Sequence, residues 1–392
     1  MPYRRSRLSL VLLVVTLLVQ AGAVSDGAPA GPVKPYEYTV PEAANDGWDT
    51  AHVSSENIDV EMLKALFDRV LNETYKNIHS VLLVRNDKLV VEEYFQTWHG
   101  DAASRDLIRA LDRVTIHQQH SVTKSVTSLL IGIAIDQQLI RDVEEKISTF
   151  FPEYADIFAD STKDSLRLKH FLTMSALAWD ELTYPYTDSR NDHVSLNRSK
   201  DPIRYALGRP IVGAPGTQFV YNSGIAITLG EIIYKVSGMR ADKFAERYLF
   251  APLGISNYYW WKYPNGTVQT GGGLSLQPRD MAKIGALMLH GGRWQGQQII
   301  SAAWVKAATQ PHVSTGLPPR QVAPEYGYQW WLGAFRVGER VIASYSARGR
   351  GGQFIFVFPD LHLVAVFTGW NDNALWVQPV EMLQEYILPA VK

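Results

Sequence analysis

Ser121 and Lys124 lie three positions apart, at the start of the segment HSVTKSVTSLLIGIAIDQQLI, residues 120–140. On an α-helix, residues three apart share a face, so the hydroxyl and the amine come within reach of each other. A lysine amine in a largely apolar setting loses its preference for the charged form, and its pKa falls. It can then accept the proton of the hydroxyl and leave a nucleophilic serine. This S-x-x-K spacing therefore indicates a serine nucleophile with a lysine base.

The segment that carries this pair predicts a buried helix. Apolar residues fill nearly every position from 126 to 135, on all sides of a 3.6-residue period; such a helix belongs inside a large domain. Its start offers unpaired backbone N–H groups and a positive dipole end, which would stabilise an oxyanion. The alternative is a plain helix cap by Ser121, with Lys124 solvated one turn further on.

Tyr221 is the best candidate for the proton donor that a leaving group needs. It follows the turn at Pro215-Gly216 and precedes an apolar helix. Beside a lysine ammonium its phenol pKa would drop, which would let it exchange protons with Ser121. The alternative is a tyrosine that only packs. His120 adjoins the nucleophile, but adjacent helix positions point about 100° apart, so we expect a structural role for it.

The elements around these residues predict an α/β fold of the α+β kind. Helical spacing covers residues 58–75, and two strands flank Asn86-Asp87-Lys88 within residues 79–95. Further helices are expected at 143–151, 166–174, 222–236, 241–250, 278–289, 302–308 and 377–388, and strands at 326–335, 340–345, 353–358 and 363–368. Strands early and late predict an antiparallel sheet built from both chain ends and flanked by helices, with a mainly helical insertion. The polar segment 175–210 is expected to border a cleft.

The N-terminal residues have the pattern of an export signal. Arg4, Arg5 and Arg7 precede a 12-residue apolar run at 8–19, and Ala21-Gly22-Ala23 suits a cleavage site. We expect a signal peptide at 1–23, a flexible lead-in at 24–55 and a catalytic domain at 56–392, in a secreted or periplasmic protein. The alternative is an uncleaved membrane anchor.

Composition excludes several function classes. The net charge of the 392-residue chain is −1, and it has no basic run, so we expect neither nucleic acid nor a membrane surface as partner. It has no cysteine, which excludes a disulfide framework and a thiolate nucleophile or metal site. Its ten histidines show no ligand spacing, so we predict no metal and no cofactor. The expected partner is a small-molecule amide or ester; the oligomeric state stays open.

Seven stretches, in order, resemble the serine β-lactamase-related hydrolases, which include class C β-lactamases, D,D-peptidases, esterases and 6-aminohexanoate-dimer hydrolase. They are SVLLVRNDKLVVEEYF, HSVTKSVTSLLIGIAID, LKHFLTMSALAWDE, PGTQFVYNSG, GGGLSLQPRDMAKIGALML, YGYQWW and ARGRGGQFIFVFPDLHLVAVFTG. The branch near 6-aminohexanoate-dimer hydrolase is the most similar. The resemblance covers about residues 56–390. It implies a β-lactamase/D,D-peptidase-like fold, with the sheet from about 56–115 and 271–392 and the helical part from about 116–270.

The resemblance implies roles for individual residues. Ser121 corresponds to the nucleophile, Lys124 to its partner, and Tyr221 to the tyrosine of the Y-x-N motif. Ser223 stands where many relatives have asparagine, and is expected to donate one hydrogen bond to Lys124 or to a substrate carbonyl. Trp179, with Asp180 and Glu181, is expected to border the pocket. An acidic side chain there would suit an amine-bearing substrate, or it would only cap or face solvent.

The third family motif corresponds to Ala347-Arg348-Gly349, where alanine replaces the usual cation. Arg348 or Arg350 would then hold a substrate carboxylate by a bidentate pair, or would simply be solvated. The resemblance also implies an oxyanion hole from the backbone N–H groups of Ser121 and Arg350, with Gly349 allowing close approach.

Together these features predict a serine hydrolase that cleaves an amide or ester bond through an acyl-enzyme on Ser121. The missing cation at Ala347 argues against efficient β-lactamase or carboxypeptidase action. Two alternatives remain: a D,D-carboxypeptidase or β-lactamase acting on peptidoglycan peptides or β-lactams, and a non-catalytic sensor domain of the same fold.

Overall fold

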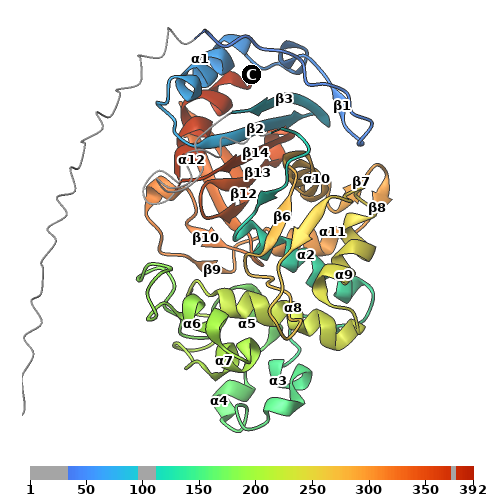
Figure 1. Cartoon of the computed structure of the whole chain (residues 1–392), viewed down its shortest axis with the longest axis vertical. Coiled ribbons are helices and arrows are strands. Elements are labelled where there is room, and N and C mark those ends of the chain that lie inside the picture. The colour runs from blue at the N-terminus through green and yellow to red at the C-terminus, as the bar shows by residue number, and fades with distance from the viewer. Residues whose placement is uncertain (1–33, 96–111, 372–376) are drawn as a thin grey trace, which may run out of the picture. The chain divides into compact units, whose positions relative to one another are not determined.

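A nine-stranded sheet organises the computed structural model, which describes residues 34–95, 112–371 and 377–392 (Figure 1). The strand order is β1-β3-β2-β14-β13-β12-β11-β10-β9. The strands are β1 (Asp49–Thr50), β2 (Ile78–Arg85), β3 (Lys88–Tyr94), β9 (Val313–Ser314), β10 (Glu325–Tyr326), β11 (Trp331–Val337), β12 (Arg340–Gly349), β13 (Gln353–Phe358) and β14 (Leu363–Gly369). All neighbouring strands are antiparallel except β1 and β3.

The two ends of the chain meet at the centre of this sheet. Strand β2 pairs with β14, with Val84 opposite Val364. The β2–β3 hairpin turns at Asn86 and Asp87, which both have left-handed backbone angles, φ 48° and 67°. Asparagine and aspartate tolerate this conformation better than other non-glycine residues, which explains the tight turn. The mixed α/β architecture with a large antiparallel sheet and helices is the one predicted from the sequence.

One face of the sheet is covered by helices from both chain ends. Helix α1 (Val60–Leu71) buries Leu63 and Phe67 in the same apolar cluster as Val81 of β2 and Phe356 of β13. The C-terminal turns α12 (Gln378–Met382), η8 (Leu383–Ile387) and α13 (Leu388–Ala390) complete that cluster. Asp59 caps α1 by accepting hydrogen bonds from two backbone N–H groups of its first turn.

The opposite face packs against α10 (Pro278–Leu289) and α2 (Val122–Asp136). A Cβ atom on Gly285 of α10 would lie 2.4 Å from Cγ1 of Val364, so this helix sits directly on β14. Helix α2 is buried at every position from Val122 to Ala134, as its all-round apolar pattern predicted.

The segment between the two parts of the sheet is mostly helical and lies at the end of Figure 1 away from β1–β3. It contains α3 (Ile147–Phe150), η3 (Pro152–Tyr154), α4 (Ser161–Asp164), α5 (Leu168–Leu172), α6 (Asp192–Arg198), α7 (Pro202–Gly208), α8 (Ser223–Ser237), α9 (Ala241–Ala245) and η4 (Glu246–Phe250). A small sheet of β4 (His117–Gln118), β6 (Leu274–Leu276) and β5 (Tyr258–Trp260) leads into and out of it.

The remaining elements are short. They are η1 (Val53–Glu56), β7 (Arg293–Trp294), β8 (Gln297–Gln298), α11 (Ala302–Ala308), η5 (Pro319–Gln321) and η6 (Pro359–Leu361). In the part of the chain that the structure describes, no helix is long and apolar enough to cross a membrane.

The structure corrects the expected flexible lead-in over residues 34–55. Tyr36 and Trp48 are buried, and β1 pairs with β3. The Trp48 indole donates a hydrogen bond to the Arg279 carbonyl at 3.4 Å. The Pro- and Gly-rich composition suggested mobility, but two aromatic rings anchor this stretch. Residues 24–33 and the expected signal peptide, 1–23, lie outside the described residues.

Several predicted element boundaries also differ. The expected helix at 143–151 forms only over α3, and the one at 166–174 only over α5. The polar segment 175–210, for which no helix was predicted, contains α6 and α7. The expected strand at 326–335 divides into β10 and β11 around a turn at Gln329, whose φ is 63°.

Candidate active site

Ser121 stands at the N-terminus of α2, directly after a sharp turn of the backbone. His120, with φ 46°, has a left-handed conformation and turns the chain from β4 into the helix. The Ser121 side chain forms no capping hydrogen bond with the helix backbone. Its hydroxyl instead lines a cavity. The interpretation of Ser121 as a plain helix cap is therefore wrong.

Lys124 lies one turn into α2 and is 2% exposed. Its Nζ donates hydrogen bonds to Ser121 Oγ at 3.0 Å and to the Gly271 carbonyl at 2.5 Å. Burial lowers the pKa of Lys124 to about 8, although the negative charge of Glu181 opposes this shift. A substantial fraction of Lys124 is therefore neutral at a pH near this value. Because the side chain is buried, the alternative of a solvated lysine is wrong.

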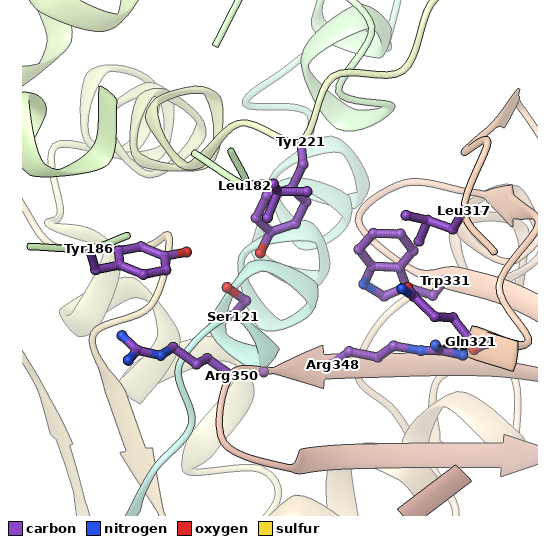
Figure 2. Close-up of a pocket in the computed structure, with 10 residues that line it drawn as sticks. Ser121, Leu182, Tyr186, Tyr221, Leu317, Gln321, Trp331, Arg348 and Arg350 are labelled. Carbon is purple, nitrogen blue, oxygen red and sulfur yellow. Dashed lines mark hydrogen bonds between the residues drawn. The ribbon is translucent and has the colours of Figure 1, made fainter. Parts of the chain in front are cut away.

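Tyr221 completes a three-residue cluster. Its ring centroid lies 4.9 Å from Lys124 Nζ, and its ring stacks on Trp331 at 5.9 Å between centroids. Its hydroxyl points toward Ser121 (Figure 2), with which it forms a side-chain hydrogen bond. The cluster thus brings together the three residues that the sequence singled out.

The acidity of Tyr221 differs from the expectation. Burial raises its pKa above the ordinary value for a phenol, and the charge of Glu181 raises it further, while the hydrogen bond with Ser121 opposes the shift. The sequence prediction of a lowered pKa is wrong because it weighed only the nearby ammonium. Tyr221 is therefore a neutral phenol, which is a proton donor.

The end of β12 closes the site on the other side of Ser121. A Cβ atom on Gly349 would lie 2.2 Å from the Gln119 carbonyl oxygen and 3.2 Å from the Ser121 backbone nitrogen. Only glycine fits here, because any side chain would push the strand away from the helix start. Ala347, two residues earlier, is fully buried in the core around α2.

The two nearby arginines have different environments. Arg348 is 6% exposed, and its guanidinium donates to Ser346 Oγ at 2.8 Å and to the carbonyls of Gln321 and Val322 at 2.6 and 3.0 Å. Burial lowers its pKa to about 9, and no carboxylate among the described residues forms an ion pair with it. The side chain of Arg350 is exposed, with its guanidinium 4.9 Å from the Tyr186 ring centroid.

Figure 2 shows both arginine side chains leading away from Ser121, Arg348 toward Gln321 and Arg350 toward Tyr186. The alternative of a simply solvated arginine is wrong for Arg348, which ties down the segment before β10. Neither guanidinium points at the Ser121 hydroxyl in this view.

Ser223 does not have the expected partner, and Trp179, which was expected to border the pocket, is not among the residues that line the cavities at Ser121. Ser223 Oγ donates to Glu181 at 2.7 Å rather than to Lys124. Trp179 is 8% exposed, packs beneath Gly224, and donates its indole N–H to Glu181 at 2.8 Å. Both side chains therefore hold Glu181 in position by hydrogen bonds, and Glu181 lines one of the cavities at Ser121.

Glu181 is the functional candidate whose role the sequence left open. It was expected either to bind an amine-bearing substrate or to cap or face solvent, but it is 2% exposed and accepts four hydrogen bonds. Tyr186, Leu317 and Trp331, which also line the site, were not singled out. The cluster Trp179-Asp180-Glu181 was the available clue, but spacing cannot tell which of its two acids is buried.

Ser121 lines two cavities of different polarity. The first, about 360 Å³, is mainly apolar and is lined by Ser121, Leu182, Tyr186, Tyr221, Leu317, Gln321, Trp331, Arg348, Gly349 and Arg350. The second, about 210 Å³, is more polar than the first and is lined by Gln118, His120, Ser121, Glu181, Tyr186, His193, Asn197, Ser223, Trp261, Gln269, Gly271, Gly272, Gly273 and Arg350. Ser121, Tyr186 and Arg350 belong to both.

The site has no evident place for a metal ion. Across residues 34–95, 112–371 and 377–392, no group of three or more His, Cys, Asp or Glu side chains could hold one.

Comparisons with known proteins identify the family of the chain. A family model described as Beta-lactamase matches residues 72–371. A 6-aminohexanoate-dimer hydrolase from Paenarthrobacter ureafaciens is 26% identical over 274 residues, which cover 65% of this chain and 67% of that protein. A proposed D-alanyl-D-alanine carboxypeptidase from Salmonella typhi is 23% identical over 216 residues. That match covers 53% of this chain and only 49% of the relative.

Solved structures show the same fold. The structure of a proposed 6-aminohexanoate-dimer hydrolase from Bacillus anthracis superposes with a TM-score of 0.63 at 21% identity. The match covers 84% of this chain and 81% of that one. At this identity the likeness concerns the fold alone.

Proposed function

The chain belongs to the β-lactamase family, and on that premise we propose that it is a serine hydrolase that cleaves an amide or ester bond through an acyl-enzyme on Ser121. One observation carries the proposal. The Nζ of a lysine only 2% exposed lies 3.0 Å from the Ser121 hydroxyl oxygen, and burial makes that lysine a usable base near neutral pH.

Acylation uses all three residues of the cluster. Ser121 Oγ attacks the substrate carbonyl carbon while its proton passes to Lys124 Nζ. When the tetrahedral intermediate collapses, the leaving amine or alcohol takes the phenol proton of Tyr221, and the Lys124 ammonium then restores that proton. The raised pKa of Tyr221 keeps it protonated until the leaving group needs the proton.

Deacylation reverses the proton path. A water molecule attacks the acyl carbonyl and gives a proton to the Tyr221/Lys124 pair. Ser121 Oγ leaves and recovers a proton, so the acid product is released and the free serine is restored. Each step conserves protons without any further group.

Backbone donors would stabilise the negative charge on the carbonyl oxygen. We assign the oxyanion hole to the backbone N–H groups of Ser121 and Arg350, as the resemblance implies. A Cβ atom on Gly349 would lie only 3.2 Å from the Ser121 nitrogen, and this close approach supports a shared position at the helix start and the strand end. Removing one such donor typically costs about 2.7–4 kcal/mol of barrier.

The two cavities support a substrate of mixed polarity. An apolar group on one side of the scissile bond would enter the cavity formed by Leu182, Leu317 and Trp331, and a polar group would enter the second, more polar cavity. Ala347 supplies no cation, and Arg348 already binds two backbone carbonyls. These features favour an esterase or amidase over a carboxypeptidase or β-lactamase. Export of the protein also stays a proposal, which rests on the pattern at residues 1–23.

Intact-protein mass spectrometry tests the proposal. The protein from residue 24 onward is treated with a fluorophosphonate, p-nitrophenyl butyrate or a penicillin, alongside Ser121→Ala. We expect a Ser121-dependent phosphonate adduct, ester turnover and no lasting penicillin adduct. A stable penicilloyl adduct on Ser121 would favour the D,D-peptidase alternative, and absence of every adduct would favour the non-catalytic sensor.

A further inference from the structure

We propose that Glu181 is a positioning residue of this site: its buried carboxylate holds the segments that border Ser121 and places a negative charge near Lys124, the proposed base. The inference rests on the proposed function, because it concerns the base of that reaction. It assigns to the buried acid a role in setting the pH range of acylation rather than in binding substrate.

The hydrogen bonds of Glu181 satisfy both of its oxygens. Oε2 accepts the Trp179 indole N–H at 2.8 Å and the Ser223 backbone N–H at 3.0 Å. Oε1 accepts the Ser223 hydroxyl at 2.7 Å and the Tyr186 hydroxyl at 2.9 Å. A carboxylate with four donors strongly prefers its charged form. It has little capacity left for a substrate ammonium, which argues against the amine-binding alternative.

These contacts connect the polar loop after α5 with the start of α8. Ser223 is the first residue of α8, so Glu181 satisfies a helix-terminal N–H at the positive end of the helix. Ser223 follows Tyr221 by two residues, and Tyr186 lines both cavities. Glu181 therefore fixes the position of the proton donor and of the wall that separates the two cavities.

The charge of Glu181 acts on Lys124 without a direct ion pair. Lys124 Nζ bonds to Ser121 and to the Gly271 carbonyl, while the pull of Glu181 partly offsets the effect of burial on the lysine. Burial alone would raise the pKa of Glu181, but the charges of His193 and Lys124 and the hydrogen bonds from Ser223 bring it below the ordinary value. Glu181 is therefore anionic wherever Lys124 titrates.

The other titratable groups around Glu181 do not account for the electrostatic effect on Lys124. They are His193 on α6, the phenols of Tyr186, Tyr221 and Tyr263, and Arg350, which acts on Tyr186. Burial lowers the pKa of His193, and the charge of Glu181 counteracts this. Removing that charge would lower the pKa of His193 further, so His193 stays neutral in the range where Lys124 titrates.

Glu181→Gln separates charge from hydrogen bonding. The amide oxygen can take the place of Oε2 and accept both N–H groups, while the amide NH₂ can take the place of Oε1 and donate to the two hydroxyl oxygens. The substitution thus removes the negative charge and keeps the four hydrogen bonds. Tyr186→Phe is the matched control, because it removes one hydrogen bond and keeps the charge.

The experiment measures the rate of Ser121 labelling by a fluorophosphonate from about pH 6 to pH 10, a range that spans the lysine titration. In the wild type the rate rises as Lys124 loses its proton. In Glu181→Gln we expect the midpoint of this rise to move down by about one pH unit, as for removal of a nearby opposite charge. In Tyr186→Phe we expect a lower rate with the midpoint unchanged.

A midpoint that stays in place or moves up in a folded Glu181→Gln protein would overturn the inference and leave the proposed function intact. If the wild type is not labelled at Ser121, the proposed function fails, and the inference fails with it. If Glu181→Gln does not fold, Ser223→Ala replaces it, since it deletes the 2.7 Å hydrogen bond and keeps the charge. The inference then requires slower labelling with an unmoved midpoint, and a rate equal to the wild type would contradict it.

Discussion

Lys124 Nζ donates a 3.0 Å hydrogen bond to Ser121 Oγ from a side chain that is almost entirely buried. The pair combines the proposed nucleophile with the proposed base, whose charged form is disfavoured by its surroundings. This relationship makes the site testable without knowledge of the natural substrate, because the proposal requires the protonation state of the lysine to control the reactivity of the serine.

Ser121→Ala should abolish ester turnover and phosphonate labelling. The Ser121 side chain does not cap α2, so its loss should cost less than the roughly 1 kcal/mol typical of a lost helix cap. Activity is measured with p-nitrophenyl butyrate and stability by thermal unfolding. A variant that keeps wild-type turnover would exclude Ser121 as the nucleophile.

The rate of acylation should rise with pH through about 8, the value to which burial lowers the pKa of Lys124. The sign follows from the role of a base, because only the neutral amine accepts the Ser121 proton. Lys124→Met should lose acylation across the whole range, since a thioether cannot serve as the base. A pH profile that is flat between about pH 6 and 10 would contradict lysine as the base.

Gly349→Ala should slow acylation strongly, because the new Cβ would lie 2.2 Å from the Gln119 carbonyl and must displace β12 from Ser121. Loss of one oxyanion donor typically lowers kcat about 100- to 1,000-fold. Gly208→Ala is the matched control, since a Cβ there meets nothing within 4 Å. Equal activity of the two variants would show that β12 does not need this close approach.

Leu317→Asp should reduce kcat/KM for long-chain p-nitrophenyl esters more than for the acetate. The charged side chain would stand in the mainly apolar cavity beside Ser121. Loss of apolar burial of the size of one side chain, about 1.5–3 kcal/mol, corresponds to about tenfold or more. Leu139→Asp, a partly exposed leucine absent from both cavities, serves as control. An equal loss of kcat/KM for esters of every acyl length would show that the acyl group does not bind in this apolar cavity.

Much of the fold could be predicted because it depends on local patterns. The all-round apolar period of α2, the Asn86-Asp87 turn of the β2–β3 hairpin and the late strands are properties of neighbouring residues. The formation of one sheet from both chain ends was predicted because strands occur early and late in the chain, with helices between them. The lead-in over 34–55 could not be predicted, since its anchors, Tyr36 and Trp48, bind to partners far along the chain.

The sequence by itself determined the residues to which the chemistry is assigned: a hydroxyl and an amine three residues apart at the start of a buried helix, and a tyrosine before a second helix. Only the tertiary structure decided which acid is buried, which way the arginines lead, and that the pKa of Tyr221 rises rather than falls. The physical reason is that burial and electrostatic coupling depend on groups distant in sequence. Glu181, Ser223 and Lys124 interact only because α2, α8 and the loop after α5 pack together.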